Sequence, residues 1–305
     1  MDPVSVILTI CTAATPLLIA ATGELVVERS GVLNLGVEGM MIVGAVAAFA
    51  AANATGSAGL GVLAGTLAGA AFSLLFGLLT LTLVTNQVAS GLALTILGLG
   101  ISGLLGTGFT GVPGVRLPNL DLGPLTDLPV IGPIVFGQDA IFYLSLLLVV
   151  TVAWFLFRSR AGLTLRAVGD NHTSADALGV DVIRVRYLAV LFGGACAGLA
   201  GAHLSLVYVP QWIEGMTAGR GWIALALVVF ASWRPARVLL GAYLFGAVSI
   251  GQYHAQALNV ALPSQLLSAL PYLATIVVLV VIARNRRTTL LNTPASLGRP
   301  FVPNR

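Results

Sequence analysis

Long apolar stretches, each about 20 residues in length, make up most of this sequence, and a helix of that length crosses the hydrocarbon core of a membrane. Charged residues form only 9% of the chain, whereas soluble domains carry about 25%. The stretches lie at 4–22, 34–53, 58–84, 88–108, 139–157, 188–209, 217–233, 238–257 and 265–283. We therefore expect an all-α polytopic membrane protein, a single transmembrane domain over residues 1–305 with about eight to ten crossings. A broken or re-entrant segment at 34–53 or 210–233 would change that count.

Arginines indicate the side of the membrane on which the connecting segments lie. The polar segment 158–187, the pair Arg234 and Arg237, and the tail 284–305 all carry arginine, so the positive-inside rule places them in the cytoplasm. The C-terminus is then cytoplasmic, and the segment 109–138 falls on the outer side. Its prolines favour turns over helix. We predict an external loop there that serves as a surface for a partner.

All fifteen lysine or arginine residues of the chain are arginine. Without lysine the chain has no phosphate-binding P-loop and no Schiff-base chemistry. Cys11 and Cys196 lie in apolar stretches and form no disulfide or zinc framework, and no hydrolase motif is present. The arginines form no basic stripe with interleaved aromatic residues, so nucleic acid is not an expected partner. We predict a chain that is not an enzyme, with no catalytic residue, metal site or cofactor of its own. If ATP drives it, the nucleotide binds another chain.

The segment 158–187 is the one long polar segment in the interior of the chain. Within it, residues 173–179 have the pattern of a short helix. Thr173 is a candidate N-cap, Asp176 would complete a capping box, and Gly179 would end the last turn. So short a helix is not stable alone and must pack on another surface. We interpret it as a coupling helix that docks on a cytoplasmic motor subunit, and a solvated connector is the alternative.

A carboxylate enters the apolar stretch that begins near residue 34. Charged side chains at the membrane centre cost about 2.5 to 3.5 kcal/mol on insertion scales, so Glu38 should face protein or a water-filled cavity. Asn34 and Glu38 are one helical turn apart and would share a helix face. Nearby glycines let the backbone line a cavity, as in broken transporter helices. We predict that both residues line or brace the translocation path. The alternative is that Glu38 is an interfacial residue that pairs with Arg29 or another arginine near the cytoplasmic surface.

Further polar residues stand out against the apolar background. Asn86 and Gln87 lie between two apolar stretches, where they are either path residues or a solvated turn. Glu214 and Arg220 flank a glycine-rich stretch and are either path residues or a structural ion pair. Trp222 is a candidate wall for a bound substrate, or an anchor at the membrane interface. With the preceding pair, these residues are our candidates for the translocation path.

Small residues recur every four positions in the third apolar stretch, at Gly61, Gly65, Gly69, Ser73 and Gly77. Such a ridge lets a second helix approach closely, and it indicates either tight packing or a mobile seam in a transporter core. Residues 67–74 on this ridge and residues 199–206 share a faint pattern, Leu-Ala-Gly-Ala followed by Ser-Leu. The two stretches are expected to run in opposite directions. An inverted repeat would produce that relation, and so would chance in a chain rich in Gly, Ala and Leu.

Several motifs resemble those of the permease subunits of bacterial ABC importers of the branched-chain amino acid, simple sugar and nucleoside group, over nearly the whole chain. Asn-Leu-Gly-Val-Glu-Gly-Met-Met at 34–41, Asn-Gln-Val-Ala-Ser-Gly at 86–91 and Gly-Met-Thr-Ala-Gly-Arg-Gly at 215–221 look most like the nucleoside permeases that work with a basic-membrane-protein-type binding lipoprotein. Arg-Ala-Val-Gly-Asp-Asn at 166–171, followed by Ala-Asp-Ala-Leu-Gly at 175–179, is similar to the cytoplasmic coupling region of that family. Ala-Asp-Ala stands where Glu-Ala-Ala is usual, which bears on individual contacts more than on the role.

The resemblance implies an all-helical permease of the bacterial inner membrane that works with a second homologous permease chain, two ABC ATPase subunits that use ATP, and an external substrate-binding lipoprotein. The implied substrate is a neutral nucleoside, a purine nucleoside first, carried inward. The coupling residues would be Arg166, Gly169, Asp170, Thr173, Asp176, Ala177 and Gly179. Simple sugars or branched-chain amino acids are the alternative substrates, and a proton-coupled secondary carrier that titrates Glu38 or Glu214 is the alternative mechanism.

Overall fold

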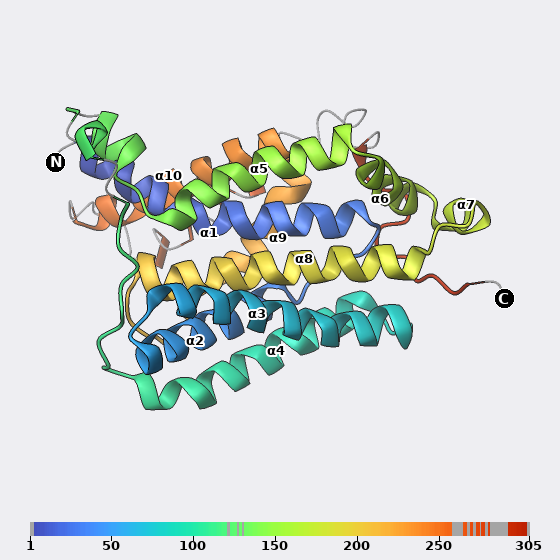
Figure 1. The fold of residues 1–305 in the computed structure, drawn as a ribbon, viewed down its shortest axis with the longest axis horizontal. Coiled ribbons are helices and arrows are strands. Elements are labelled where there is room, and N and C mark those ends of the chain that lie inside the picture. The colour runs from blue at the N-terminus through green and yellow to red at the C-terminus, as the bar shows by residue number, and fades with distance from the viewer. Residues whose placement is uncertain are drawn as a thin grey trace.

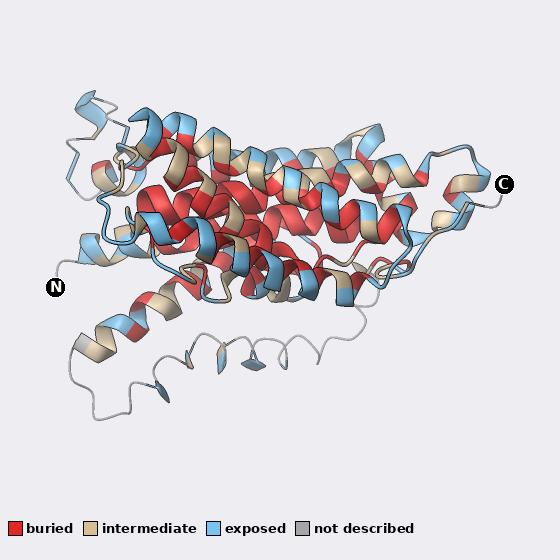
Figure 2. Ribbon diagram, turned by 90° about the horizontal axis from the view of Figure 1, so that it is seen from below, coloured by how far each residue is buried: buried red, intermediate tan, exposed pale blue. Residues whose placement is uncertain are grey.

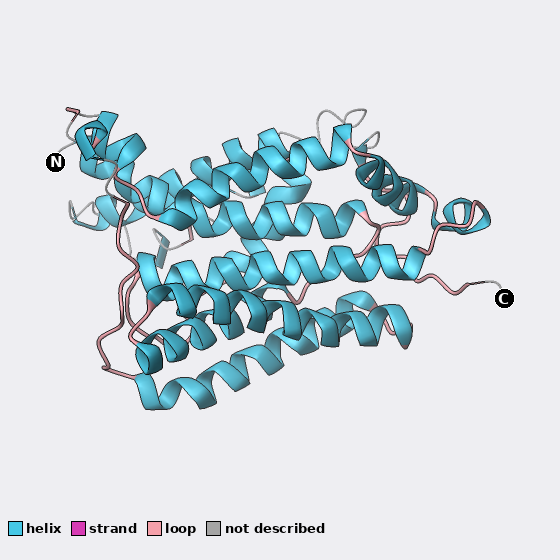
Figure 3. Cartoon of the chain, in the orientation of Figure 1, coloured by secondary structure: helices cyan, strands magenta, loops and turns pink. Residues whose placement is uncertain are grey.

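The computed structural model describes residues 3–120, 123–126, 128–129, 131–257 and 292–303, together with positions 265–266, 269–270, 273–274, 276–277 and 280. Across these residues the chain forms helices joined by loops, with isolated bridges in place of β-strands (Figure 3). The helices are α1 (Pro3–Arg29), α2 (Val37–Thr55), α3 (Ala58–Gly77), η1 (Leu78–Thr82), α4 (Gln87–Gly106), η2 (Thr107–Phe109), η3 (Gly123–Leu125), η4 (Gly132–Phe136), α5 (Ala140–Arg158), α6 (Arg160–Asp170), α7 (His172–Ala177), α8 (Val182–His203), η5 (Leu204–Tyr208), α9 (Arg220–Phe230) and α10 (Pro235–Ala257). The predicted all-α class is confirmed.

The long helices form one bundle. In Figure 1, α5, α1, α8, α3 and α4 lie alongside one another, with α6 and α7 at one end and the N-terminus and the proline-rich segment toward the other. Six helical units of the described chain are long and apolar enough to cross a membrane: α1, α2, α3 with η1, α4 with η2, α5, and α8 with η5. Buried residues concentrate in the middle of the bundle (Figure 2). We call the end that carries α6 and α7 the docking end.

The helix α9 is too short to cross a membrane. Its 11 residues correspond to about 16 Å of rise, about half of the 30 Å hydrocarbon core. The predicted stretch 217–233 is therefore interrupted, as the broken-segment alternative anticipated. The predicted stretch at 265–283 lies largely outside the described residues. The total number of crossings therefore stays a prediction.

Glycine holds the centre of the bundle together. The five residues of the small-residue ridge on α3, at every fourth position from Gly61 to Gly77, are all buried and face α2 and α8. A methyl group on Gly65 would lie 2.7 Å from the carbonyl oxygen of Gly44, and one on Gly69 would lie 2.6 Å from the Cα atom of Gly198. Since neither space admits a methyl group, the ridge on α3 is a site of tight packing. Along this contact, Gly61 meets Leu206 in η5, which continues α8, and Gly77 meets Tyr187 in α8. The helices α3 and α8 therefore run antiparallel, the relation expected of these two apolar stretches.

The proline-rich segment is mostly non-helical, as its turns predicted, although η4 is a short helix inside it. It folds back over the end of the bundle opposite the docking end through two isolated bridges, from Thr110 to Trp212 and from Pro113 to Gln211. A methyl group on Gly114 would lie 2.7 Å from the ring of Phe49 on α2. The segment is therefore packed against the bundle and the chain that precedes α9.

Candidate functional site

The N-terminus of α9 meets the N-terminus of α2 inside the bundle. The carboxylate of Glu38, in the first turn of α2, accepts a hydrogen bond from the amide of Gly219 at 2.8 Å and another from Gly221 at 2.6 Å. Glu38 is buried, with 3% of its surface exposed. The amide groups at a helix N-terminus lack partners within the helix and carry a partial positive charge, so they favour an anion. The alternative pairing of Glu38 with Arg29 is wrong.

The glycines at this junction are required by space and by backbone conformation. Gly219 has φ +78°, and a methyl group on Gly221 would lie 2.6 Å from the Cα atom of Glu38. From the junction, α2 runs toward the proline-rich end, where Phe49 contacts Gly114. The helix α9 runs the other way, toward Trp233 near the end of α1. Two helices thus diverge from one buried carboxylate, which we call the Glu38 junction.

Asn34 does not share a helix face with Glu38, so that prediction is wrong. The residues from Gly31 to Gly36 are not helical, and α2 begins only at Val37. Gly31 has φ +87°, and the side chain of Asn34 accepts a hydrogen bond from the amide of Gly36 at 3.0 Å, a local turn that competes with helix. Asn34 is fully buried, and its backbone and side-chain amides donate to Glu24 at 3.3 Å and 3.4 Å.

The first helix supplies two buried carboxylates that the sequence analysis did not single out. α1 continues to Arg29, beyond the predicted end at residue 22. Glu24 and Glu28 are therefore inside the bundle, each 1% exposed, and lie one turn apart on one face. Glu28 accepts a hydrogen bond from the indole of Trp233 at 2.6 Å. The spacing of the two carboxylates on an otherwise apolar helix was the signal that could have identified them.

The structure does not pair Glu214 with Arg220. The guanidinium of Arg220 donates to the carbonyl oxygens of Met216 and Thr217 at 3.0 Å and 3.3 Å and lies 5.1 Å from the centre of the Tyr208 ring. Glu214 is exposed. Nε2 of His203 on α8 lies 3.7 Å from the carboxylate of Asp139, the N-cap of α5. This contact, which the sequence analysis did not identify, links α8 to the beginning of α5.

A groove of about 400 Å³ lies next to the Glu38 junction, between α4, α9 and the segment after α1. Its wall includes Trp222, which is 46% exposed, Glu28 of α1, and apolar side chains of the neighbouring elements. Gln87, at the start of α4, is buried and accepts a hydrogen bond from the amide of Leu33 at 2.8 Å. Asn86 is exposed and caps α4 through the amide of Ala89. Gln87 thus supports the wall of the groove, whereas Asn86 serves as a helix cap.

The docking end is more helical than predicted. α6 covers Arg160–Asp170 and α8 begins at Val182, so little of the segment 158–187 is loop. α6 is amphipathic, with Leu165 and Val168 buried and Arg160 exposed. Arg166 lies 5.3 Å from the centre of the Phe157 ring. The periodic apolar positions of α6 were the signal in the sequence, masked by the high arginine content.

The short helix α7 exists, but its predicted N-cap is wrong. Asn171, not Thr173, accepts the hydrogen bond from the amide of Ser174 at 3.0 Å. With the helix starting at His172, Asp176 is too late in the helix to complete a capping box. Gly179 does end the helix with φ +84° and donates to the carbonyl of Asp176 at 2.8 Å. Ala177 is exposed, and beside it Leu178 is 84% exposed at the tip.

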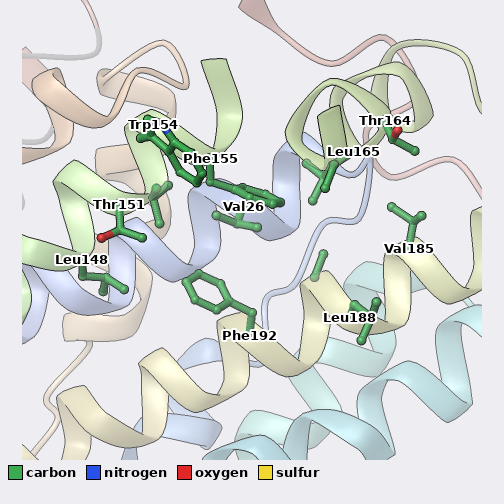
Figure 4. A pocket seen from close by; sticks show the side chains of 13 residues that line it. Val26, Leu148, Thr151, Trp154, Phe155, Thr164, Leu165, Val185, Leu188 and Phe192 are labelled. Carbon is green, nitrogen blue, oxygen red and sulfur yellow. The ribbon is translucent and has the colours of Figure 1, made fainter. Parts of the chain in front are cut away.

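A second cavity, of about 530 Å³, lies between α1, α5, α6 and α8 near the docking end. Figure 4 shows Phe155 and Trp154 on one side and Phe192, Val185 and Leu188 on the other. Its lining is almost entirely apolar, with only the hydroxyls of two threonines to interrupt it. Such a lining offers a polar solute few hydrogen-bond partners. The groove beside the Glu38 junction is also largely apolar, but Asn34 lies between two of its lining residues, Leu33 and Leu35, and Gln87 bonds to Leu33. We therefore take the Glu38 junction with its groove as the candidate substrate site.

Comparison with known proteins identifies the class to which this architecture belongs. The family model described as the permease component of branched-chain amino acid transport systems matches residues 6–283. A putative glucose ABC transporter permease protein of Haloferax volcanii is 44% identical over 95% of this chain and 94% of its own. The nucleoside ABC transporter permease protein of Lactococcus lactis is 33% identical over 87% and 88%. A guanosine ABC transporter permease protein of Bacillus subtilis is 33% identical over 76% and 77%.

No solved structure matches the chain. The family match covers most of the sequence, the three relatives are matched over most of their own lengths, and the fold is a bundle of apolar helices. The chain therefore belongs to the family of permease components of branched-chain amino acid transport systems, the membrane subunits of ABC importers.

Proposed function

We propose that this permease carries a neutral, sugar-containing solute inward, and that a nucleoside is its first candidate substrate. The names of the relatives support this class, since they include nucleoside, guanosine and glucose permeases. Guanosine and glucose both carry hydroxyl-rich rings and no net charge. The proposed solute would pass beside the Glu38 junction.

The charges at the junction support a neutral solute over an amino acid. Both carboxylate oxygens of Glu38 already accept amide hydrogens, and the guanidinium of Arg220 is bound by carbonyl oxygens and a ring. Both oxygens of Glu38 are therefore engaged and closed to an ammonium group, and Arg220 is already held by groups of the protein. Charged groups left unpaired within a membrane are costly, whereas a neutral solute requires only a few amides or hydroxyls and an apolar wall.

Trp222 is the observation that carries the choice of a nucleoside over a free sugar. Its exposed indole lines the groove next to the junction. A nucleobase can stack on such a ring, and base stacking on aromatic side chains is worth about 1 to 3 kcal/mol. A free sugar has no planar base to use this wall.

Competition during uptake tests the substrate. Vesicles that contain the full complex and its binding protein would take up labelled guanosine, and excess unlabelled nucleoside, glucose, ribose or leucine would be added. We expect nucleosides to compete and leucine not to. Trp222→Ala should raise the half-saturating guanosine concentration about tenfold, with Trp222→Phe near wild type. Trp154→Ala, which removes another exposed indole, is the matched control. Competition by glucose alone, with no effect of Trp222→Ala, would favour the free sugar.

ATP-driven transport requires partners, and the docking end offers a place for one of them. We propose that α6 and α7 seat in an ABC ATPase subunit on the cytoplasmic side, with Leu178 at the tip of the contact. The proline-rich end then faces the external binding lipoprotein, and a second homologous permease chain completes the pathway in the plasma membrane. The position of α7 supports this arrangement, because the helix projects from the end of the bundle with Thr173, Ser174 and Ala177 exposed (Figure 1).

The proton-coupled carrier is the weaker mechanism. A titrating carboxylate must release its proton to solvent, whereas Glu38 is buried and both of its oxygens accept backbone amides. These bonds hold the Glu38 side chain in place as a joint between two helices. Uptake that requires ATP and the ATPase chains, and persists when the proton gradient is collapsed, is the result that supports the ABC mechanism.

A further inference from the structure

Arg186, in the second turn of α8, is a fully buried side chain with 1% exposure. Its guanidinium joins three separate segments of the chain. Nε donates to the carbonyl oxygen of Ser30 after α1 at 3.2 Å, and Nη1 donates to that of Arg299 near the C-terminus at 3.2 Å. Nη2 lies 3.1 Å from Nδ1 of His172 on α7, which must accept because arginine has only donors. The partners are carbonyl and imidazole groups, so the position of the guanidinium is set by backbone geometry.

Two glycines bring the same segments into backbone contact. A methyl group on Gly31 would lie 3.3 Å from the Cα atom of Gly169 on α6 and 2.9 Å from Nη2 of Arg186. Gly31 also has φ +87°, which side chains rarely adopt. A methyl group on Gly169 would in turn collide with the carbonyl of Arg29. The end of α6 is thus pressed against the residues that follow α1.

The described part of the C-terminal tail, residues 292–303, lies across this contact. We call it the strap. The amide of Ser296 donates to the carbonyl of Gly169 at 2.8 Å, and the amide of Gly298 donates to that of Gly31 at 3.1 Å. Phe301 packs edge to face on His172, with ring centres 5.2 Å apart. The strap therefore bonds to both sides of the contact and is no free tail.

The residues on the far side of the contact lead directly to the candidate substrate site. Gly31 begins the non-helical run that contains Asn34 and ends at α2, whose first turn carries Glu38. A displacement of α6 and α7 must therefore move this run unless the strap and Arg186 release it.

We propose that the strap and Arg186 together transmit movement from the docking end to the run 31–36 at the substrate site, with Arg186 as a positioning residue. This inference rests on the proposed ATP-driven function. Among the residues that the structure describes, the buried guanidinium of Arg186 has no carboxylate partner, an arrangement that stability alone does not favour. A link between two moving segments explains this arrangement, because the three acceptors keep their positions around the Arg186 guanidinium only while the segments move together.

Two changes break the link and leave the residues of the docking end and of the substrate site in place. Arg186→Lys keeps the charge but loses the planar fork of donors. Truncation after Leu291 removes the strap. The matched controls are Arg184→Lys, an exposed arginine two positions earlier, and truncation after Phe301, which keeps the strap bonds. In reconstituted complexes we expect assembly and basal ATP hydrolysis to persist in all four. Substrate stimulation of hydrolysis should fall about tenfold in the first two and remain in the controls.

Amide hydrogen exchange on the full permease chain supplies a readout that does not need the ATPase. Loss of the strap should speed exchange at residues 30–36 and 169–179 together, and leave the centre of α3 unchanged. Wild-type stimulation and unchanged exchange in both variants would overturn the proposal. If one variant fails to fold, the other decides. A wild-type complex without ATP-dependent uptake would contradict the proposed function instead. The exchange result would still show whether the strap holds residues 30–36 and 169–179 together.

Discussion

The amide nitrogen of Gly221 lies 2.6 Å from a carboxylate oxygen of Glu38, a residue 183 positions earlier in the chain. This bond and its partner at Gly219 join the beginning of α2 to the beginning of α9. Each helix contributes its positive end, so one negative charge stabilises both. A single side chain thus fixes the relative position of two helices that run in opposite directions.

Glu38→Leu should harm uptake far more than Glu38→Gln. Leucine leaves the amides of both glycines without acceptors, and an unsatisfied buried donor costs about 1 to 3 kcal/mol. Glutamine retains one acceptor oxygen and places its NH₂ group against the second amide. The measurement is guanosine uptake at equal expression. Equal loss in both variants, with loss of the pH dependence of transport, would point instead to the proton-coupled carrier.

Gly221→Ala should destabilise the permease even though alanine favours helix. The added methyl group would lie 2.6 Å from backbone atoms of Glu38, and overpacking of this kind costs about 1 to 3 kcal/mol. Gly100→Ala is the control, since a methyl group at that helical position meets no atom within 4 Å. Thermal unfolding in detergent compares the two. A melting temperature for Gly221→Ala at or above that of the control would contradict the packing at the junction.

The docking end should lose stability in mild acid. Burial, followed by the charges of Arg186 and Arg299, holds the pKa of His172 below its ordinary value of 6.5. In the unfolded chain the imidazole binds a proton below about pH 6.5, whereas in the folded chain it stays neutral to lower pH. The contribution of His172 is therefore complete above that pH and is lost as the pH falls toward the folded pKa. Melting temperatures between pH 8 and 5 should fall more for the wild type than for His172→Gln. Parallel curves would count against this account.

Asn171→Ala should weaken coupling, whereas Thr173→Ala should not. Asn171 caps α7, and loss of such a cap costs about 1 kcal/mol. Thr173 is exposed and is not the cap. Substrate-stimulated ATP hydrolysis of the reconstituted complex is the measurement. The opposite order of effects would restore Thr173 to the role that the sequence first suggested.

Sequence patterns predicted the elements whose causes are local. Apolar length identified the membrane helices, and the need for a positive φ located the end of α7 at Gly179. The interruption at residues 31–36 was harder, because Asn34 and Glu38 fit a helical spacing equally well. The break depends on the side chain of Asn34 and on its buried partner Glu24, and no spacing rule identifies a partner on another helix.

The partners of charged residues could not be predicted for the same reason. Glu38 was expected to face protein, and it does, but its acceptance of backbone amides from α9 depends on a contact between distant segments. Trp233, at the end of an apolar stretch, is buried against Glu28. Arg186 lies in the arginine-rich segment 158–187, yet its three acceptors come from parts of the chain more than a dozen residues away.

The glycine contacts among α2, α3 and α8 constrain how a transport cycle can proceed. A methyl group on Gly44 would lie 2.5 Å from the Cα atom of Gly198, and one on Gly69 would lie 2.6 Å from the same atom. Sliding any of these helices would bring bulkier residues into spaces that admit only hydrogen. We therefore expect the three to behave as one rigid slab. Alternating access would then come from rotation of α4 and the half-helix α9 about that slab, with Glu38 as the pivot.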